Sequence, residues 1–173
     1  MRLHTALKLM AAAVVAAAVM AAPVSMKAQG GDTVLKPADT QKLLPANVFY
    51  RGQSATTQLR NSGGVKFADG FYVLATLVDT SGYSTDLQSK YQAWFVTEVP
   101  IKVGGQSLPA GVYGVGFVGG KFLVTDVGAH DVLSVSSGED AELKRPMPLQ
   151  VMANPAGGGF RLYALRHYVV FSR

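Results

Sequence analysis

Three glycines in the middle of the chain have the spacing of a nucleotide-binding loop. Gly114, Gly116 and Gly119, in the segment YGVGFVGGKF, match the pattern G-x-G-x-x-G. In dinucleotide-binding proteins this pattern follows a strand and opens a helix, so that the phosphates meet the helix N-terminus. Here the next residues, KFLVT, alternate in polarity and include β-branched side chains, which indicates a second strand. The sequence therefore predicts no dinucleotide site at these glycines.

The residues around these glycines, and the rest of the chain, also exclude two other kinds of phosphate-binding loop. The glycine-rich loop of protein kinases does lie between two strands, but the other kinase motifs are absent and 173 residues are too few for that fold. A P-loop is excluded because Gly120-Lys121 is followed by Phe122, where Ser or Thr would hold magnesium.

A β-hairpin accounts for the same glycines. Residues 112–118 and 121–126 form its strands, and Gly119-Gly120 supplies the positive φ that a two-residue turn requires. Gly114 and Gly116 then share one face of the first strand. Positions without a side chain suit strong curvature, or the close approach of another backbone or of a ligand.

Two histidines outside the N-terminal segment, His130 and His167, are the candidates for metal chemistry. No H-x-H or H-E-x-x-H is present, and no three ligands have metal-site spacing. A metal site would have to be assembled from distant strands, using His130, Asp131, His167 and Asp126. A metal-dependent enzyme built on the two histidines is therefore one alternative. The other is that both are ordinary structural residues, one in a turn and one in a strand.

Nucleophilic catalysis has no better support. The motifs G-x-S-x-G and S-x-x-K are absent, and Glu98 is the only glutamate in the central strands. We therefore expect a protein that is not an enzyme and that needs no cofactor.

The C-terminal segment FRLYALRHYVVF, residues 160–171, has Arg166 and His167 at the middle of an apolar stretch. A bulge or turn at these two residues would give a final hairpin. In a single continuous strand, one of them would instead point into the interior and need a partner such as Glu98. The second arrangement would provide an anchor for an acidic ligand.

Aromatic side chains are frequent on the predicted strands. An aromatic strip could bind sugar rings or line a lipid cavity, whereas packing in the core explains the same residues with fewer assumptions. The candidate ligand-binding residues are Arg166, His167, Trp94, Tyr113 and Tyr163.

The first 28 residues have the layout of a secretory signal peptide. A basic start is followed by residues 9–26, which carry no charge, and cleavage after either Ala21 or Ala28 fits. Without this segment, which contains Arg2, Lys8 and Lys27, the 16 basic residues become 13 against 11 acidic ones. We therefore expect an exported protein, periplasmic or secreted, with no stable membrane span once the signal is removed.

The rest of the chain predicts one all-β domain, an antiparallel sandwich or barrel of about eight to ten short strands over residues 47–173. Residues 29–46 are expected to form a flexible leader and one short helix at Pro37–Leu44, and STDLQSKY, residues 84–91, is a weaker helical candidate. Cysteine is absent, so no disulfide stabilises the fold. No basic cluster remains that would indicate nucleic-acid binding.

One segment resembles a known group of proteins. Val103-Gly104-Gly105, Leu108-Pro109-Ala110-Gly111 and Tyr113 form a VGGxxLPAGxY-type segment. It is similar to that of small exported bacterial β-proteins of uncharacterised function, over roughly 70 residues that end with RLYALRHYVVF. The resemblance implies an exported, mostly β domain and assigns no catalytic residue.

Three functions follow as hypotheses. The first is an exported, non-catalytic β domain that acts by binding or interaction, with a small apolar ligand, a glycan or another exported protein as partner. The second is a lipocalin-like carrier of a small apolar or acidic ligand, which requires an internal cavity of several hundred cubic ångströms. The third is the metal-dependent enzyme that uses His130 and His167.

Overall fold

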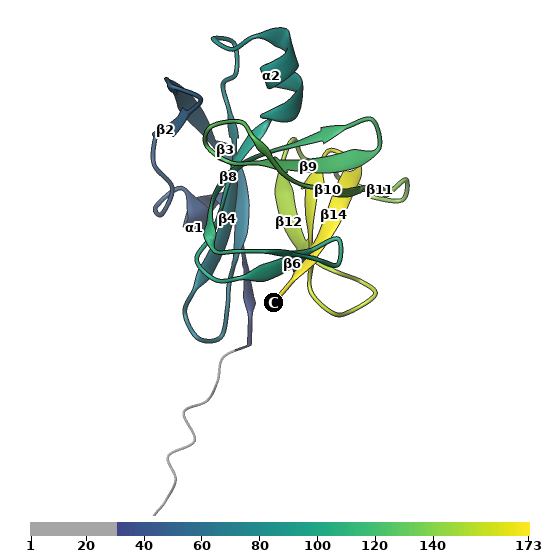
Figure 1. Cartoon of the computed structure of the whole chain (residues 1–173). Coiled ribbons are helices and arrows are strands. Elements are labelled where there is room, and N and C mark those ends of the chain that lie inside the picture. The colour runs from purple at the N-terminus through teal and green to yellow at the C-terminus, as the bar shows by residue number, and fades with distance from the viewer. Residues whose placement is uncertain (1–30) are drawn as a thin grey trace, which may run out of the picture.

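The computed structural model describes residues 31–173, which form two antiparallel β-sheets packed face to face (Figure 1). The predicted signal peptide, residues 1–28, lies outside the described residues. The all-β prediction is confirmed: within residues 31–173 the strands form a sandwich-like fold and no closed barrel.

The first sheet contains eight strands within the described part of the chain. Their order is β1-β3-β4-β5-β8-β9-β10, and β2 pairs with β3 outside this path. These strands are β1 (Thr33–Leu35), β2 (Asn47–Tyr50), β3 (Gln53–Lys66), β4 (Tyr72–Val78), β5 (Ala93–Thr97), β8 (Gly111–Val118), β9 (Lys121–Thr125) and β10 (Asp131–Ser136).

The second sheet has six strands over the same residues, in the order β12-β13-β14-β6-β7, with β11 paired to β14. Fourteen strands in residues 31–173 exceed the eight to ten predicted, because several span only two or three residues and have no alternation to detect. The strands of this sheet are β6 (Ile101–Val103), β7 (Gln106–Leu108), β11 (Gly138–Glu139), β12 (Gln150–Ala153), β13 (Phe160–Ala164) and β14 (His167–Ser172).

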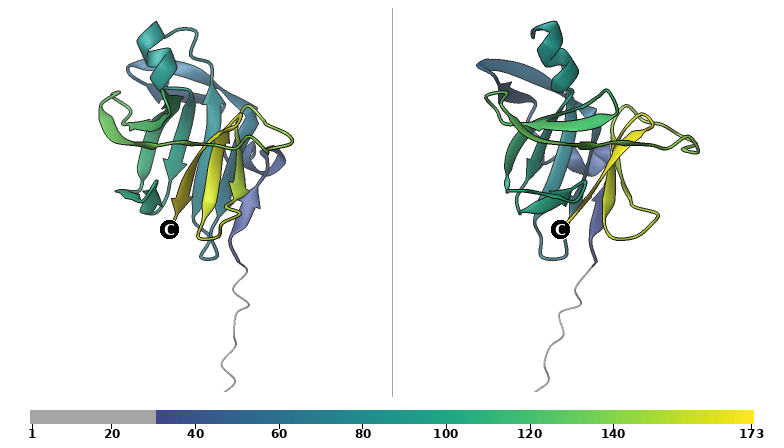
Figure 2. Two further views of the ribbon diagram at one scale, coloured as in Figure 1. Left: turned by 90° about the vertical axis from the view of Figure 1, so that its right-hand side faces the viewer. Right: turned by 45° about the vertical axis from the view of Figure 1, so that its right-hand side comes forward.

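The terminal strands of the two sheets meet at both open sides of the sandwich. At one side β1 contacts β12, and at the other β10 contacts β7. In the right-hand view of Figure 2, β1 (purple) lies beside β12 (yellow-green).

The main core fills the space between the sheets. Alternate residues of each strand point inward, as Val73 and Ala75 do on β4 and Val169 and Phe171 on β14. Burial of each larger apolar side chain, such as valine or phenylalanine, stabilises the folded state by roughly 1.5–3 kcal/mol. A void of about 10 Å³ next to Leu162 is at the lower limit for a single water molecule. The region between the sheets is therefore packed and leaves no room there for a ligand.

Two short helices join the strands. Helix α1 (Pro37–Thr40) begins at the predicted proline but ends four residues before the predicted end at Leu44, and turns follow it. Helix α2 (Thr85–Lys90) lies in the segment that was the weaker candidate. The predicted flexible leader was wrong for residues 33–35, since β1 pairs with residues 64–66 of β3. Within residues 31–173, no helix is long and apolar enough to cross a bilayer.

The glycine-rich segment forms the predicted hairpin. Strands β8 and β9 pair across Gly119-Gly120, with φ angles of 57° and 75°, in the register of a two-residue turn. The predicted close approach of another backbone is also confirmed. A Cβ on Gly116 would overlap the carbonyl oxygen of Lys90 and lie 2.9 Å from its carbonyl carbon, so α2 ends directly against β8.

A second, smaller core lies on the outer face of the first sheet. Helix α2 and the β2–β3 hairpin cover Tyr50, Tyr83 and Tyr91, which pack together with Val48, Ala55 and Val78. The rings of Tyr50 and Tyr91 are stacked with centroids 3.7 Å apart. We call these six residues the tyrosine cluster.

Replacing Gly116 by alanine should destabilise the protein. The added methyl group meets backbone atoms of Lys90, which cannot rotate away as a side chain would, so we expect a loss of about 1–3 kcal/mol. The midpoint of urea-induced unfolding measures it. Gly82→Ala is the matched control, because its Cβ would meet only Gln53 Oε1, at 3.6 Å. Equal midpoints for the two variants would contradict the close approach of α2 to β8.

Candidate functional site

The two histidines lie apart and do not form a metal site. His130 is exposed and its Nδ1 lies 2.9 Å from Asp126 Oδ2. The exposed ring of His167 instead lies against Phe117, with centroids 6.4 Å apart.

The neighbours of the two histidines pair with different ends of β9. Phe117, which contacts His167, pairs with Phe122, whereas Asp131, which follows His130, pairs with Thr125, about 10 Å further along the strand. No group of three His, Asp or Glu residues in the described chain could hold a metal ion. The four residues of the alternative metal site, His130, Asp131, His167 and Asp126, therefore do not all come together within residues 31–173.

The C-terminal segment forms a hairpin and not a continuous strand. Ala164 pairs with His167, and Leu165 has a φ of 55°, so the turn consists of Leu165 and Arg166. The guanidinium of Arg166 donates to the backbone carbonyls of Asp140 and Ala141, at 3.1 and 2.6 Å.

The partner suggested for an inward Arg166 or His167 is engaged elsewhere. Glu98 Oε2 accepts the backbone N–H of Tyr72 at 2.8 Å. An acidic ligand anchored between the sheets by Arg166 or His167 therefore has no geometric basis.

The three candidate aromatic residues do not form a strip. Tyr113 is buried in the main core and its hydroxyl donates to the Pro109 carbonyl at 3.0 Å. Trp94 is half-buried beside the tyrosine cluster. Tyr163 donates to Asp140 Oδ2 at 2.9 Å on the second sheet. Because the three rings lie in separate surroundings, packing explains them better than a shared ligand does.

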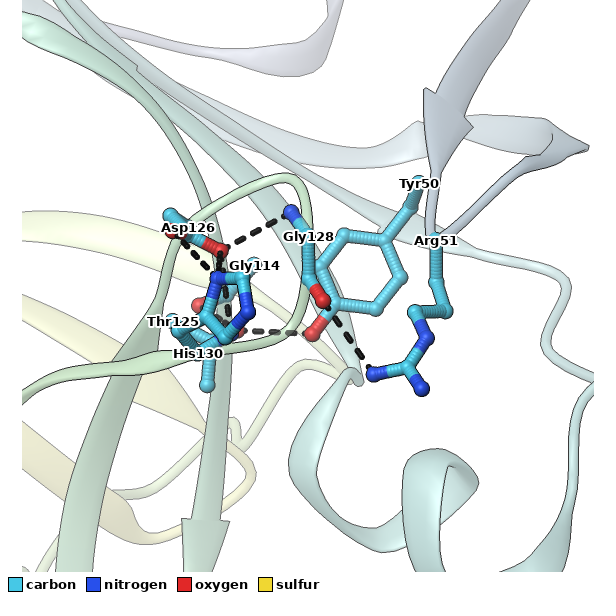
Figure 3. A network of polar contacts seen from close by, with 7 residues as sticks. All are labelled: Tyr50, Arg51, Gly114, Thr125, Asp126, Gly128 and His130. Atoms are coloured by element: carbon cyan, nitrogen blue, oxygen red, sulfur yellow. Dashed lines mark hydrogen bonds and ion pairs between the residues drawn. The ribbon is translucent and has the colours of Figure 1, made fainter.

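A polar network connects the tyrosine cluster to the turn between β9 and β10 (Figure 3). Thr125 Oγ1 donates its single proton to the Gly114 carbonyl at 3.1 Å, so the Tyr50 hydroxyl donates to Thr125 at 2.7 Å. Arg51 Nη1 donates to the Gly128 carbonyl at 3.2 Å, and the φ of Arg51 is 50°. These bonds hold the β2–β3 hairpin against the β9–β10 turn.

A second network lies around Arg161 on the other sheet. Its guanidinium carbon is 3.9 Å from the centroid of the Tyr168 ring. Its nitrogen atoms donate to Asn154 Oδ1 at 3.0 Å and to the Tyr163 hydroxyl at 3.1 Å, and lie 3.4 Å from Asp140 Oδ2. Every charge in this group has a partner, so it fixes the 140–145 loop to the sheet.

An apolar groove of about 440 Å³ lies at the side of the sandwich where β1 faces β12. At this side β12 lies directly against β3, since a Cβ on Gly63 would be 2.9 Å from the Val151 nitrogen. The lining comes from β1 and the start of α1, from Ser62, and from the segment that leads into β12. The residues of this β1–β12 groove are Val34, Leu35, Lys36, Pro37, Ser62, Met147, Leu149, Gln150, Val151, Met152 and Ala153.

The lining of the groove is mainly apolar. The Ser62 hydroxyl is hydrogen-bonded to Thr40 Oγ1 at 2.6 Å, and Lys36 is the one ionisable residue of the lining. Met147 and Met152, 43% and 40% exposed, are flexible side chains that adapt to ligands of different shape. None of the five predicted ligand-binding residues lines this groove.

Sequence reasoning missed the groove because one wall is β1, which was assigned to a flexible leader. The only indication in the sequence was the presence of Met147 and Met152 on both sides of Leu149.

In comparisons by sequence and by structure, no protein-family model, no curated protein and no solved structure matches the chain. The resemblance to exported bacterial β-proteins therefore stays a prediction.

Tyr91→Phe should leave stability unchanged or raise it. The Tyr91 hydroxyl is buried and has no hydrogen-bond partner among the described residues, and burial strongly raises its pKa. Removing such a group relieves a desolvation cost of about 1–3 kcal/mol. Tyr50→Phe is the matched comparison in the same ring stack, and should cost about 0.5–1.5 kcal/mol because its bond to Thr125 is lost. Thermal unfolding of both variants tests this, and a larger loss for Tyr91→Phe would refute it.

Asp126 should contribute to stability at neutral pH and lose that contribution in acid. Its carboxylate accepts the backbone N–H of His130 at 2.9 Å, and this bond is the main reason why the pKa of Asp126 lies below its ordinary value. The contribution is complete above the unfolded pKa of about 3.9 and disappears as the pH falls through the lower folded pKa. Unfolding midpoints between about pH 6 and pH 2.5 should fall less steeply for Asp126→Asn than for the unchanged protein. Parallel curves would contradict this.

Proposed function

We propose that this protein is an exported, non-catalytic binding protein that holds an elongated apolar ligand in the β1–β12 groove. The observation that carries the proposal is the groove itself, with its volume of about 440 Å³ and its mainly aliphatic and methionine lining. Ligand sites in proteins are typically concave, largely apolar and of about 300–1,000 Å³.

The position of the groove favours binding at the side of the sandwich over an enclosed carrier. The lipocalin-like alternative needs a cavity between the sheets, but that space is packed by residues such as Phe95, Phe122 and Phe171, each no more than 2% exposed. The groove is open along one side, so a chain-like ligand can enter without separation of the sheets. A small apolar ligand is therefore a better occupant than a glycan, whose hydroxyl groups would find few polar partners on these walls.

Export remains part of the proposal and rests on the N-terminal sequence. Periplasm and external medium are both compatible with a signal peptide. A partner protein at the groove is the competing occupant, and the experiment below separates it from a small ligand.

Filling the groove should abolish binding. Ala153 lines it, and Ala153→Trp would place an indole in the space that a ligand occupies. The affinity for the neutral apolar dye N-phenyl-1-naphthylamine, measured by its fluorescence, should fall by about tenfold or more. Ala156→Trp is the matched control, because Ala156 is exposed in the β12–β13 turn and does not line the groove.

Native mass spectrometry of protein purified gently from its host provides the second readout. Extra mass that disappears on denaturation, and that is absent from Ala153→Trp, is the expected result. Equal dye binding by both tryptophan variants would contradict the proposed site. The protein could instead show no extra small mass but co-purify with another protein that Ala153→Trp does not retain. That result would show that a protein partner, and not a small ligand, occupies the groove.

A further inference from the structure

The lining of the groove contains one charged residue, and it is a cation. Lys36 lines the groove itself, is exposed, and makes no ion pair within residues 31–173. Asp39, the carboxylate of α1, accepts the backbone N–H of Lys36 at 3.2 Å but forms no ion pair with its side chain and does not line the groove. The ammonium group is thus available to a ligand at the β1–α1 end of the groove.

A second hollow, of about 580 Å³, adjoins the groove across β12. The two share Gln150 and Met152 as a common wall. The hollow adds two exposed cations, Lys144 and Arg145, neither of which has an ion pair in the described chain.

The acidic residues of the hollow do not cancel this charge. Asp140 is bound to Arg161 and Tyr163, which leaves Glu142 as the carboxylate without such a partner. The lining of the groove and the hollow thus contains three cations against two carboxylates, one of which is paired with Arg161.

We infer that the ligand of the groove is a free, single-chain amphiphile with an anionic head, of the fatty-acid type. This inference rests on the proposed function of the groove. The alkyl chain lies along the more exposed apolar lining residues, Leu35, Met147 and Met152, and the carboxylate lies at the Lys36 ammonium group. A neutral apolar chain would leave Lys36 without a counter-charge, and a cationic head would be repelled by all three basic residues.

The geometry favours a free amphiphile over a lipid still held in a bilayer. The groove has a volume of about 440 Å³, and Lys36 is the one cation of its lining. A ligand with one chain and one charged end matches this combination of apolar residues and a single cation.

Competition for the apolar dye tests the head group. Dodecanoate, dodecanol and dodecylamine, each below its micelle-forming concentration at neutral pH, are titrated against dye bound to the protein. Dodecanoate should bind about two- to fivefold more tightly than dodecanol, which is the range for one exposed ion pair, and dodecylamine should bind more weakly than either. High salt should reduce the preference because it screens the charges.

Lys36→Gln should remove the preference for dodecanoate and leave the affinity for dodecanol unchanged. Lys42→Gln is the matched control, because Lys42 is an exposed lysine six residues further along that does not line the groove. A preference that persists in Lys36→Gln but is lost in a Lys144→Gln, Arg145→Gln variant would overturn the assignment of the head to Lys36.

The remaining outcomes separate this inference from the function on which it rests. If dodecanol and dodecanoate compete equally, the anionic head is wrong while the apolar groove stands. If no amphiphile displaces the dye, the proposed function itself fails. Co-sedimentation of the protein with vesicles of phosphatidylglycerol, without release of dye by free dodecanoate, would overturn the choice of a free ligand in favour of a membrane lipid.

Discussion

The contact between β12 and β3 at Gly63 determines how the two sheets are joined at one side. A side chain at this position would lie against the backbone of Val151, so only a glycine lets the edge of one sheet rest on the face of the other. Strand β1 pairs with β3 at the same edge, and α1 also contacts β3. Apolar residues of β1 and α1 therefore lie near the segment that leads into β12, and the groove, which Ser62 also lines, lies beside this contact.

The rest of the molecule keeps that arrangement rigid without covalent cross-links. The chain contains no cysteine, so stability comes from the packed core and from the networks that attach outlying elements. Thr125 and Arg51 fasten the β2–β3 hairpin, and Arg161 fastens the loop before β12. Threonine and arginine are residue types that often bind ligands or take part in catalysis. Here Thr125, Arg51 and Arg161 are each hydrogen-bonded to other residues of the protein.

Local patterns in the sequence predicted the local structure well. The turn at Gly119-Gly120 and the helix start at Pro37 each depend on backbone preferences of a few neighbouring residues, which are visible in the sequence. The C-terminal hairpin was one of two arrangements considered, and its turn lies at Leu165-Arg166, one residue before the expected position. Strand β1 was missed because three residues, TVL, carry no alternation, and only pairing with residues 64–66 makes them a strand. The groove could not be predicted for the same reason: its walls are about 110 residues apart in the chain. The resemblance around residues 103–113 concerned a turn and a strand, and neither lines the groove.

The methionines of the groove give its surface a chemical sensitivity that aliphatic residues would not. Met147 and Met152 expose their thioethers beside the apolar wall. Oxidation converts a thioether to a sulfoxide, which is polar and accepts hydrogen bonds strongly. A molecule oxidised at these positions would keep its fold, since both side chains lie outside the packed core, but would present a wetter surface to an alkyl chain. The fraction of protein with ligand in the groove would then depend on the oxidation state of these methionines as well as on the concentration of ligand.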